Sequence, residues 1–435
     1  MVLAPLQVTA EALNFTWILM VSFLIFFMHA GFAMLEAGQV RSKNVANQLT
    51  KNLLTWSIGV VVFFLIGSGV ASLAGGADWG AAYLASGTGW INWLYGAVFA
   101  MTGATIVSGA VAGRAKLRAY VTYTILLAGV IYPVVIAFTW SAAETGLVEQ
   151  LTGVAFTDFA GGMIVHGMGG VAGLTAAAVL GPRMGRFNED GSANVIPGHS
   201  MTFAVLGTLI LAFGWYGFNV GTSAIIGDAF LGEQLGRVAM TTTLSMAMGA
   251  IAAGGVAWAQ TGKVDTLYVA NGLLAGLVGI TAIPHTTTWW GALLVGIVSG
   301  AQLPIVFKFV ESTLNIDDVC AVFPVHGSAG IIGTLMYPFV AVSLPEGVSI
   351  GSAFIAQAVG VFLIGGWTLT ATAIIWLALK ALGESRVTPE HEQEGLDVSE
   401  HGVETYPEFG SGDSVVADGG IMSEDIKATR GSNDD

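Results

Sequence analysis

Charged side chains are scarce in this chain of 435 residues, where they make up 10% of the sequence while 54% is hydrophobic. A soluble globular domain carries about 25% charged residues, so the composition argues against one, and a soluble bundle of buried helices is the disfavoured alternative. Apolar stretches of about 20 residues recur along almost the whole chain, and each can cross a bilayer as a helix. We therefore predict an all-α integral membrane protein.

Cysteine is also nearly absent. Cys320 is the single cysteine, which excludes a disulfide within the chain. The first residues have no basic region and no small-residue cleavage site, so we expect no cleaved signal peptide. Glycine is abundant instead, with 60 residues. Small residues let membrane helices approach one another closely, which fits the predicted class.

The apolar runs divide residues 1–382 into one transmembrane domain of eleven predicted helices. The predicted spans are 14–36, 53–74, 93–112, 117–140, 160–181, 200–222, 236–259, 266–283, 288–309, 323–343 and 354–381.

Lysine and arginine are missing from alternate loops, and this absence predicts the orientation. The loops at 75–92, 141–159, 284–287 and 344–353 contain neither residue. The other loops and span edges hold Arg41, Lys43, Lys51, Arg114, Lys116, Arg118, Arg183, Arg186, Lys263 and Lys308. Only Arg237, at a span edge, departs from the pattern. Because basic loops stay in the cytoplasm, we predict a cell-membrane protein with its N-terminus outside and its C-terminus inside.

Two histidines interrupt the apolar spans with the same spacing. Asp158 precedes His166 by eight residues in "DFAGGMIVHG", and Asp318 precedes His326 by eight in "DDVCAVFPVHG". His166 lies in the fifth span and His326 in the tenth, so the second copy runs the opposite way, which predicts a five-plus-five inverted repeat with its site near the midplane. If each aspartate begins a helix, each histidine lies about 12 Å deeper, and the two rings meet in the centre of the membrane.

Facing imidazoles in a membrane allow several roles. Each ring is either a buried polar group satisfied by its neighbours or part of a proton or substrate path, and two rings at matched depth favour the path. A neutral imidazole has one donor and one acceptor and titrates near neutral pH, so a bonded pair can relay a proton. Two histidines can also hold a haem iron, which leaves a membrane haem protein as an alternative.

The residues around the histidines carry two further expectations. Asp158 is expected to cap its helix through backbone N–H groups. The flanking Gly167, Gly170 and Gly327 are expected to leave room for a narrow pore.

Four separated motifs resemble those of the Amt ammonium transporters, a branch of the Amt/Mep/Rh superfamily. They are "DFAGGMIVHGMGGVAG" (158–173), "GWYGFNVGT" (214–222), "FPVHGSAGIIG" (323–333) and "GLDVSEHGVETY" (395–406), with a looser match at "GQVRSKNV" (38–45). The resemblance covers about residues 14 to 406, and the last long motif favours this branch over the Rh type. It implies a homotrimer with one ammonium pore per subunit, no enzymatic activity, no metal or other cofactor, and no nucleic-acid partner.

The resemblance also assigns roles to six residues of the predicted path. These are Trp140 and Thr222 for recruitment of NH4+, Phe99 and Phe218 for a phenylalanine gate, and His166 and His326 for the pore and proton relay. An indole face attracts a cation, and a hydroxyl accepts its N–H. Stacked phenyl rings exclude water, which favours loss of the proton because a bare cation is costly there. Ammonia is then expected to cross along the histidines, with or without the proton.

Two positions depart from the family pattern. Thr222 stands where many members have serine, which adds a methyl group at the recruitment site. Ala321 stands where many members keep an acidic residue near the inner pore mouth.

The region after residue 382 is polar and acidic. It holds 14 Asp or Glu residues against three Lys or Arg, a net charge of −11 out of −14 for the whole chain. Residues 407–435 are rich in Gly, Ser and Asp and are predicted to form a disordered tail. Such a large tail leaves an ammonium sensor with little flux as a second alternative.

Residues 383–406 are predicted to form a cytoplasmic regulatory segment. The family-like motif within it supplies the candidate regulatory residues Gly395, Asp397, His401, Gly402 and Tyr406. The resemblance implies PII-type nitrogen-signalling proteins as a partner at this face.

Overall fold

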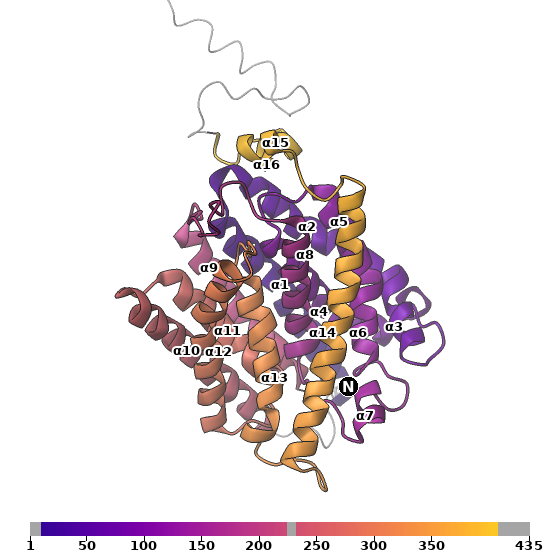
Figure 1. Cartoon of the computed structure of the whole chain (residues 1–435). Coiled ribbons are helices and arrows are strands. Elements are labelled where there is room, and N and C mark those ends of the chain that lie inside the picture. Colours follow the sequence, from indigo (N-terminus) through magenta and orange to yellow (C-terminus); the bar gives the residue numbers. More distant parts are fainter. Residues whose placement is uncertain (1–9, 224–231, 408–435) are drawn as a thin grey trace, which may run out of the picture.

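The computed structural model describes residues 10–223 and 232–407, and within them the chain forms helices joined by loops. The long helices run side by side between the two ends of the molecule (Figure 1). In chain order they are α1 (Ala10–Gln39), η1 (Ser42–Asn44), α2 (Val45–Val62), η2 (Phe63–Gly67), α3 (Ser68–Ala74), η3 (Ala82–Leu84), α4 (Thr88–Ala110), α5 (Leu117–Leu126), η4 (Leu127–Ile131), α6 (Tyr132–Ala137), α7 (Leu147–Thr152), η5 (Gly162–Gly167), α8 (Met168–Leu180), α9 (Met201–Thr222), α10 (Gly232–Thr261), α11 (Thr266–Thr281), α12 (Trp289–Ser312), η7 (Phe323–Ser328), α13 (Ala329–Val340), α14 (Ile350–Ala381), α15 (Pro389–Glu394) and α16 (Leu396–His401).

The all-helical prediction is confirmed for these residues. Among them, nine helices are long and apolar enough to cross a membrane, and α11 is a shorter apolar helix of 16 residues. The predicted span 323–343 is occupied by η7, which continues directly into α13. The predicted disordered tail lies outside the described residues, apart from its first residue, Pro407.

Four π-helical segments lie within the long helices or at their start. They are η2, η4, η5 and η7. A π-helical turn widens the helix and often occurs at functional sites. Two of the four, η5 and η7, contain His166 and His326.

Glycine lets the two histidine helices touch. A Cβ on Gly170 would lie 2.1 Å from the backbone nitrogen of Gly327, and one on Gly327 would lie 2.3 Å from the Phe323 ring. A Cβ on Gly167 would lie 2.4 Å from the Met163 sulfur. The expectation that these glycines leave room for a pore is therefore wrong, because neighbouring atoms already fill the space beside them.

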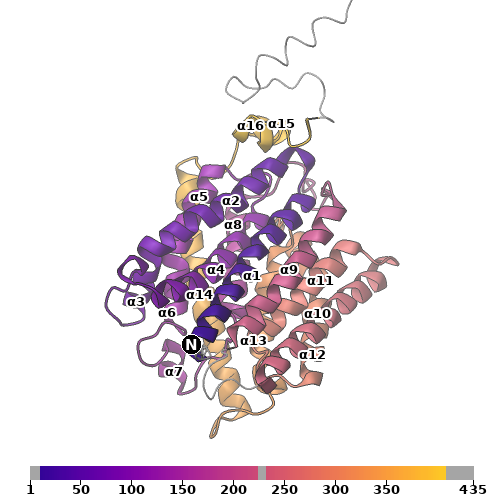
Figure 2. The ribbon, with the colours of Figure 1, turned by 180° about the vertical axis from the view of Figure 1, so that it is seen from behind.

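The two ends of the described chain lie at opposite ends of the bundle. The start of α1 lies at the end near α7, whereas α15 and α16 lie across the other end (Figures 1 and 2). There α16 packs against η1 and α2. Several basic loop residues also pair with acidic partners, as in Arg183–Asp317 and Arg386–Glu392.

Candidate functional site

His166 and His326 meet in the interior, as the repeated spacing predicts. Their Nδ1 atoms lie 3.3 Å apart, and their rings are nearly parallel, with an interplanar angle of 14°. Both side chains are buried. The short distance between the nitrogens leaves no space for an iron porphyrin between the rings, so this geometry does not fit the bis-histidine haem alternative.

The helix that carries His166 is held at its start by Asp158. The Oδ1 atom accepts the N–H groups of Gly161 and Gly162, and Oδ2 accepts those of Met163 and Ile164, at 2.7–2.8 Å. Burial raises the pKa of Asp158 to about 6, and the four N–H donors oppose that shift. The carboxylate therefore acts on the helix start, and no contact with His166 is involved.

The second histidine segment starts in the same manner. Asp318 accepts the N–H groups of Val322 and Phe323 at 2.9 and 2.8 Å. Burial raises the pKa of Asp318 to about 6, against the pull of these two donors. In both copies, however, the π-helical segment begins four or five residues after the aspartate. The assumption that each aspartate is the first residue of its helix is therefore wrong, and each histidine sits less than two helical turns from the helix start.

Aromatic rings form a continuous row from the surface to His166. Trp140, at 41% exposure, has its ring 6.0 Å from that of Phe99. The Phe99 and Phe218 rings are 4.2 Å apart, and Phe218 lies 5.2 Å from His166. The indole N–H of Trp140 donates to the backbone carbonyl of Asp158 at 2.8 Å, which fixes the indole beside the start of the histidine helix.

Thr222 joins this row through a residue that the sequence analysis missed. Its hydroxyl lies 2.6 Å from the Tyr95 hydroxyl and 2.7 Å from the Phe218 carbonyl. The Tyr95 ring in turn lies 4.9 Å from Phe99. Tyr95 is four residues before Phe99 on α4, a spacing that places both on one helix face.

Trp215 is a second residue that the sequence analysis missed. Its indole stacks on His166, with 4.6 Å between ring centroids, and its N–H donates to Thr281 Oγ1 at 2.8 Å. Trp215 is three residues before Phe218 on α9, which could have indicated a shared face.

Beyond His326 the path changes character. Phe32 lies 6.0 Å from His326, and behind it a narrow cavity of about 10 Å³ reaches Glu36 and Cys320. Neither Phe32 nor Glu36 was predicted as a site residue. Glu36 stands out in the sequence as an acidic residue within an apolar span, the feature that usually marks a functional position.

The C-terminal segment docks on η1 and the start of α2 of its own chain. Asp397 is buried, and its carboxylate accepts the backbone N–H of Asn47 at 2.9 Å and the Thr405 hydroxyl at 2.7 Å. His401 Nε2 lies 3.1 Å from the Asn47 side-chain amide.

Two glycines and a tyrosine shape the rest of this segment. Gly395 has φ +123°, and a Cβ there would lie 2.7 Å from both the Cβ and the carbonyl oxygen of Lys43. Gly402 has φ +67°, a conformation that glycine adopts readily. The Tyr406 hydroxyl lies 2.7 Å from His199 Nε2 and ties the end of the segment to the loop before α9.

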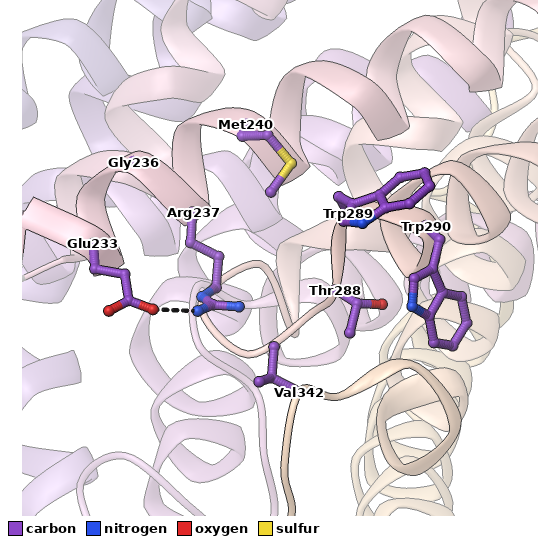
Figure 3. Close-up of a pocket in the computed structure, with 8 residues that line it drawn as sticks. All are labelled: Glu233, Gly236, Arg237, Met240, Thr288, Trp289, Trp290 and Val342. Carbon is purple, nitrogen blue, oxygen red and sulfur yellow. Dashed lines mark hydrogen bonds and ion pairs between the residues drawn. The ribbon is translucent and has the colours of Figure 1, made fainter.

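A hollow of about 370 Å³ lies apart from the predicted site residues. It is lined by Glu233, Gly236, Arg237, Met240, Thr288, Trp289, Trp290 and Val342 (Figure 3). The side chain of Arg237 pairs with Glu233 one helical turn earlier, at 2.7 Å. Arg237, which departed from the loop pattern, therefore has its charge balanced locally.

Comparisons with known proteins agree with this arrangement. The model of the Ammonium Transporter Family matches residues 16–406. Ammonium transporter Amt2 of Haloferax mediterranei is 63% identical over 97% of this chain and 95% of its own length. Ammonium transporter Amt2 of Methanocaldococcus jannaschii is 40% identical over 94% of both.

Solved structures share the fold. A structure named "Sensor Amt Protein" superposes with a TM-score of 0.83 at 33% identity, covering 89% of this chain and 98% of that one. Mep2 of Candida albicans superposes with a TM-score of 0.74 at 26% identity, covering 87% and 86%. With a family model that covers most of its length and relatives well above 30% identity, the chain belongs to the ammonium transporter family.

Proposed function

We propose that this protein moves ammonium across the cell membrane through the path formed by the aromatic row and the histidine pair. The observation that carries the proposal is the unbroken series of rings from partly exposed Trp140 to buried His326. The names of the relatives at 63% and 40% identity support ammonium as the substrate.

In the proposed mechanism, NH4+ is attracted to the Trp140 indole and to the hydroxyl of Thr222. Such an indole contributes about 1 kcal/mol to binding a cation at a partly exposed site. The Phe99 and Phe218 rings, 4.2 Å apart, allow no hydrated ion to pass without a change in ring position. Because a bare cation is costly in this surrounding, ammonium gives up its proton there and ammonia continues.

His166 and His326 then guide the ammonia. A Nδ1–Nδ1 distance of 3.3 Å suits one shared proton between the rings, which leaves the Nε2 atom of each ring outside this bond. The same shared proton makes the pair able to pass a proton along its length.

The proposed topology is eleven transmembrane helices in a five-plus-five inverted repeat, with the N-terminus outside and three copies in the assembly. The matched Asp-to-His segments support the repeat. An odd number of spans agrees with the opposite positions of α1's start and α15 (Figure 1).

The decisive experiment is current and ammonia-uptake recording on purified protein reconstituted in liposomes under an ammonium gradient. Uptake well above that of protein-free liposomes is the expected result. Ammonium binding without uptake would instead support a sensor. The absence of both binding and uptake would refute the proposal.

The C-terminal segment, residues 383–406, is proposed to regulate the pore from the cytoplasmic face, where a PII-type protein is the candidate partner. Support comes from the contact of Asp397 with the first turn of α2 and from that of Tyr406 with the loop before α9. Truncation after Tyr406 is expected to leave uptake intact, whereas truncation before Gly395 should lower it. Equal uptake from both truncations would show that the segment is passive.

A further inference from the structure

The wall of the cavity behind His326 contains polar side chains, among them Glu36. It has a volume of about 10 Å³, close to the space that one water molecule needs. Its walls include His326, Phe32, Cys320, Val322, Asn271 and Glu36. Glu36 is the single acidic residue within the eleven spans defined from the sequence. An acid in a membrane span is costly unless it is paired or functional.

The two oxygens of Glu36 have different surroundings. Oε2 accepts the amides of Gln48 and Asn52, both at 2.7 Å, and the Ser108 hydroxyl at 2.6 Å. Oε1 shares the hydrogen of this same Ser108 hydroxyl, at 2.8 Å, and has no other donor among the residues that the structure describes. Three donors in all favour the ionised form, and a carboxylate has about four acceptor positions. Oε1 therefore keeps spare acceptor capacity.

Oε1 lies beside two residues of the cavity wall. A Cβ built on Gly109 would lie 3.1 Å from Glu36 Oε1, from Cys320 Cβ and from Val322 Cγ2. Cys320 and Val322 both line the cavity, so Oε1 converges with them on its wall.

A buried lysine lies beyond Glu36. Lys51 is fully buried, and its Nζ makes no hydrogen bond within the described part of the chain. The charges of Glu36 and of Glu400 in the C-terminal segment both act on it. Gln48 and Asn52, the partners of Glu36 on α2, belong to the helix against which α16 packs.

We infer that Glu36 accepts the proton that leaves the histidine pair. It then releases the proton to the aqueous side at the end of the bundle where α15 and α16 lie. The inference rests on the proposed function. The proton given up by NH4+ passes to His166 and through the shared Nδ1–Nδ1 position to His326. A water in the cavity takes it from His326 and gives one to Glu36 Oε1. The neutral carboxyl then loses the proton to the aqueous side and returns to carboxylate. One NH4+ entering thus yields one NH3 and one proton on the other side.

A purely structural role for Glu36 predicts a different outcome. Its bonds to Gln48, Asn52 and Ser108 join α1 to α2 and α4, so its loss could simply loosen the bundle. A loosened bundle lowers the movement of charge and of ammonia together. A proton acceptor changes the charge carried per ammonia.

The test is the ratio of ammonium-driven charge to ammonia uptake, both recorded on the same liposomes. Glu36→Gln should lower this ratio by about tenfold or more, since a positioned acid–base group contributes at least that much to proton transfer. The matched control is Glu346→Gln, the same change at an exposed glutamate of the loop before α14. Its ratio should equal that of the wild type.

Each outcome decides the matter. An unchanged ratio in Glu36→Gln, whatever the uptake, overturns the inference and leaves the structural role. A wild-type protein that takes up ammonia without charge also overturns it, while the proposed transport stands. Absence of uptake in the wild type refutes the proposed function itself.

If Glu36→Gln does not yield folded protein, Glu36→Asp replaces it because a carboxylate is kept. Infrared difference spectra on addition of ammonium should then contain a protonated-carboxyl band that moves between wild type and Glu36→Asp. Identical spectra for the two proteins would overturn the inference.

Discussion

The two histidine segments begin alike and end in different surroundings. The first histidine segment (158–167) and the second (317–328) each place an aspartate before a π-helical turn that carries the histidine. The start of the first segment is held by a neutral amide of α14. The Gln357 side chain accepts the backbone N–H of Thr157 and donates to its carbonyl, each at 2.8 Å. The start of the second segment is held by an ion pair. The Arg183 guanidinium donates to both carboxylate oxygens of Asp317, at 2.8 and 2.9 Å.

The rings also meet different neighbours. His166 stacks on Trp215 and contacts Phe218, whereas His326 contacts Phe32 and lines the cavity that reaches Glu36. Repeated local sequence therefore sets the position of each ring, and the surrounding helices place aromatic rings on one side of the pair and a cavity that reaches Glu36 on the other.

The largest expected effect is on the pair itself. His166→Ala and His326→Ala should each lower ammonium-driven current about 100-fold or more, since each removes half of the shared-proton bond. Liposome current, with uptake beside it, measures the loss. His29→Leu is the control, since His29 is also buried in a span but lies outside the row. Wild-type current in both alanine variants would exclude a role for the pair.

The ion pair of Asp317 and the amide contacts of Gln357 should contribute different amounts to the free energy of unfolding. Asp317→Asn should lower the free energy of unfolding by about 3 kcal/mol, because the buried Arg183 loses its counter-charge. Gln357→Leu should cost about 2 kcal/mol, because backbone groups lose their partner. Unfolding midpoints in detergent compare them. Equal losses would mean that charge adds nothing at the start of the second segment.

A pH series sharpens this comparison. Burial alone would raise the pKa of Asp317, but the Arg183 hydrogen bonds and the charges of Arg114 and Arg183 hold it well below its usual range. Because this pKa is lowered on folding, its stabilisation is present above about pH 4 and is lost as the pH falls further. The difference in free energy of unfolding between wild type and Asp317→Asn should therefore become smaller in acid. The corresponding difference for Gln357→Leu should stay constant.

The caps offer a smaller contrast. Asp158 serves four N–H groups and Asp318 serves two, so Asp158→Asn should cost about 2 kcal/mol and Asp318→Asn about 1 kcal/mol. Hydrogen exchange of the amides after each aspartate locates the loss. The reverse order would mean that the number of donors does not decide the strength of the cap.

The smallest effect is expected at Trp140, the surface end of the aromatic row. This row leads to the first histidine segment and has no counterpart beside the second. Trp140→Leu keeps apolar bulk but removes the indole face, and should weaken the apparent ammonium affinity roughly fivefold, or about 1 kcal/mol. The concentration dependence of the current measures it, with Trp258→Leu, an exposed tryptophan of α10, as control. Equal affinities in the two variants would assign recruitment to another residue.

Much of the site followed from local sequence. The length of apolar runs predicts helices that cross a membrane, and an equal Asp-to-His spacing in two opposed spans predicts that His166 and His326 meet. The motifs named Phe99, Phe218 and Trp140, and all three lie in the row. These features depend on one segment at a time, or on a symmetry that the spacing itself carries.

Only the tertiary structure decided which helix faces meet. The π-helical segments begin four or five residues after their aspartates, and Gly170 and Gly327 bring backbones together where the sequence suggested open space. Tyr95, Trp215 and Glu36 join the path from α4, α9 and α1, because packing aims those faces at the histidines. No periodicity within α1 shows that Glu36 opposes Cys320, since the contact joins residues 284 positions apart. A sequence sets the faces that each helix offers, and the close packing of the whole bundle selects the partners.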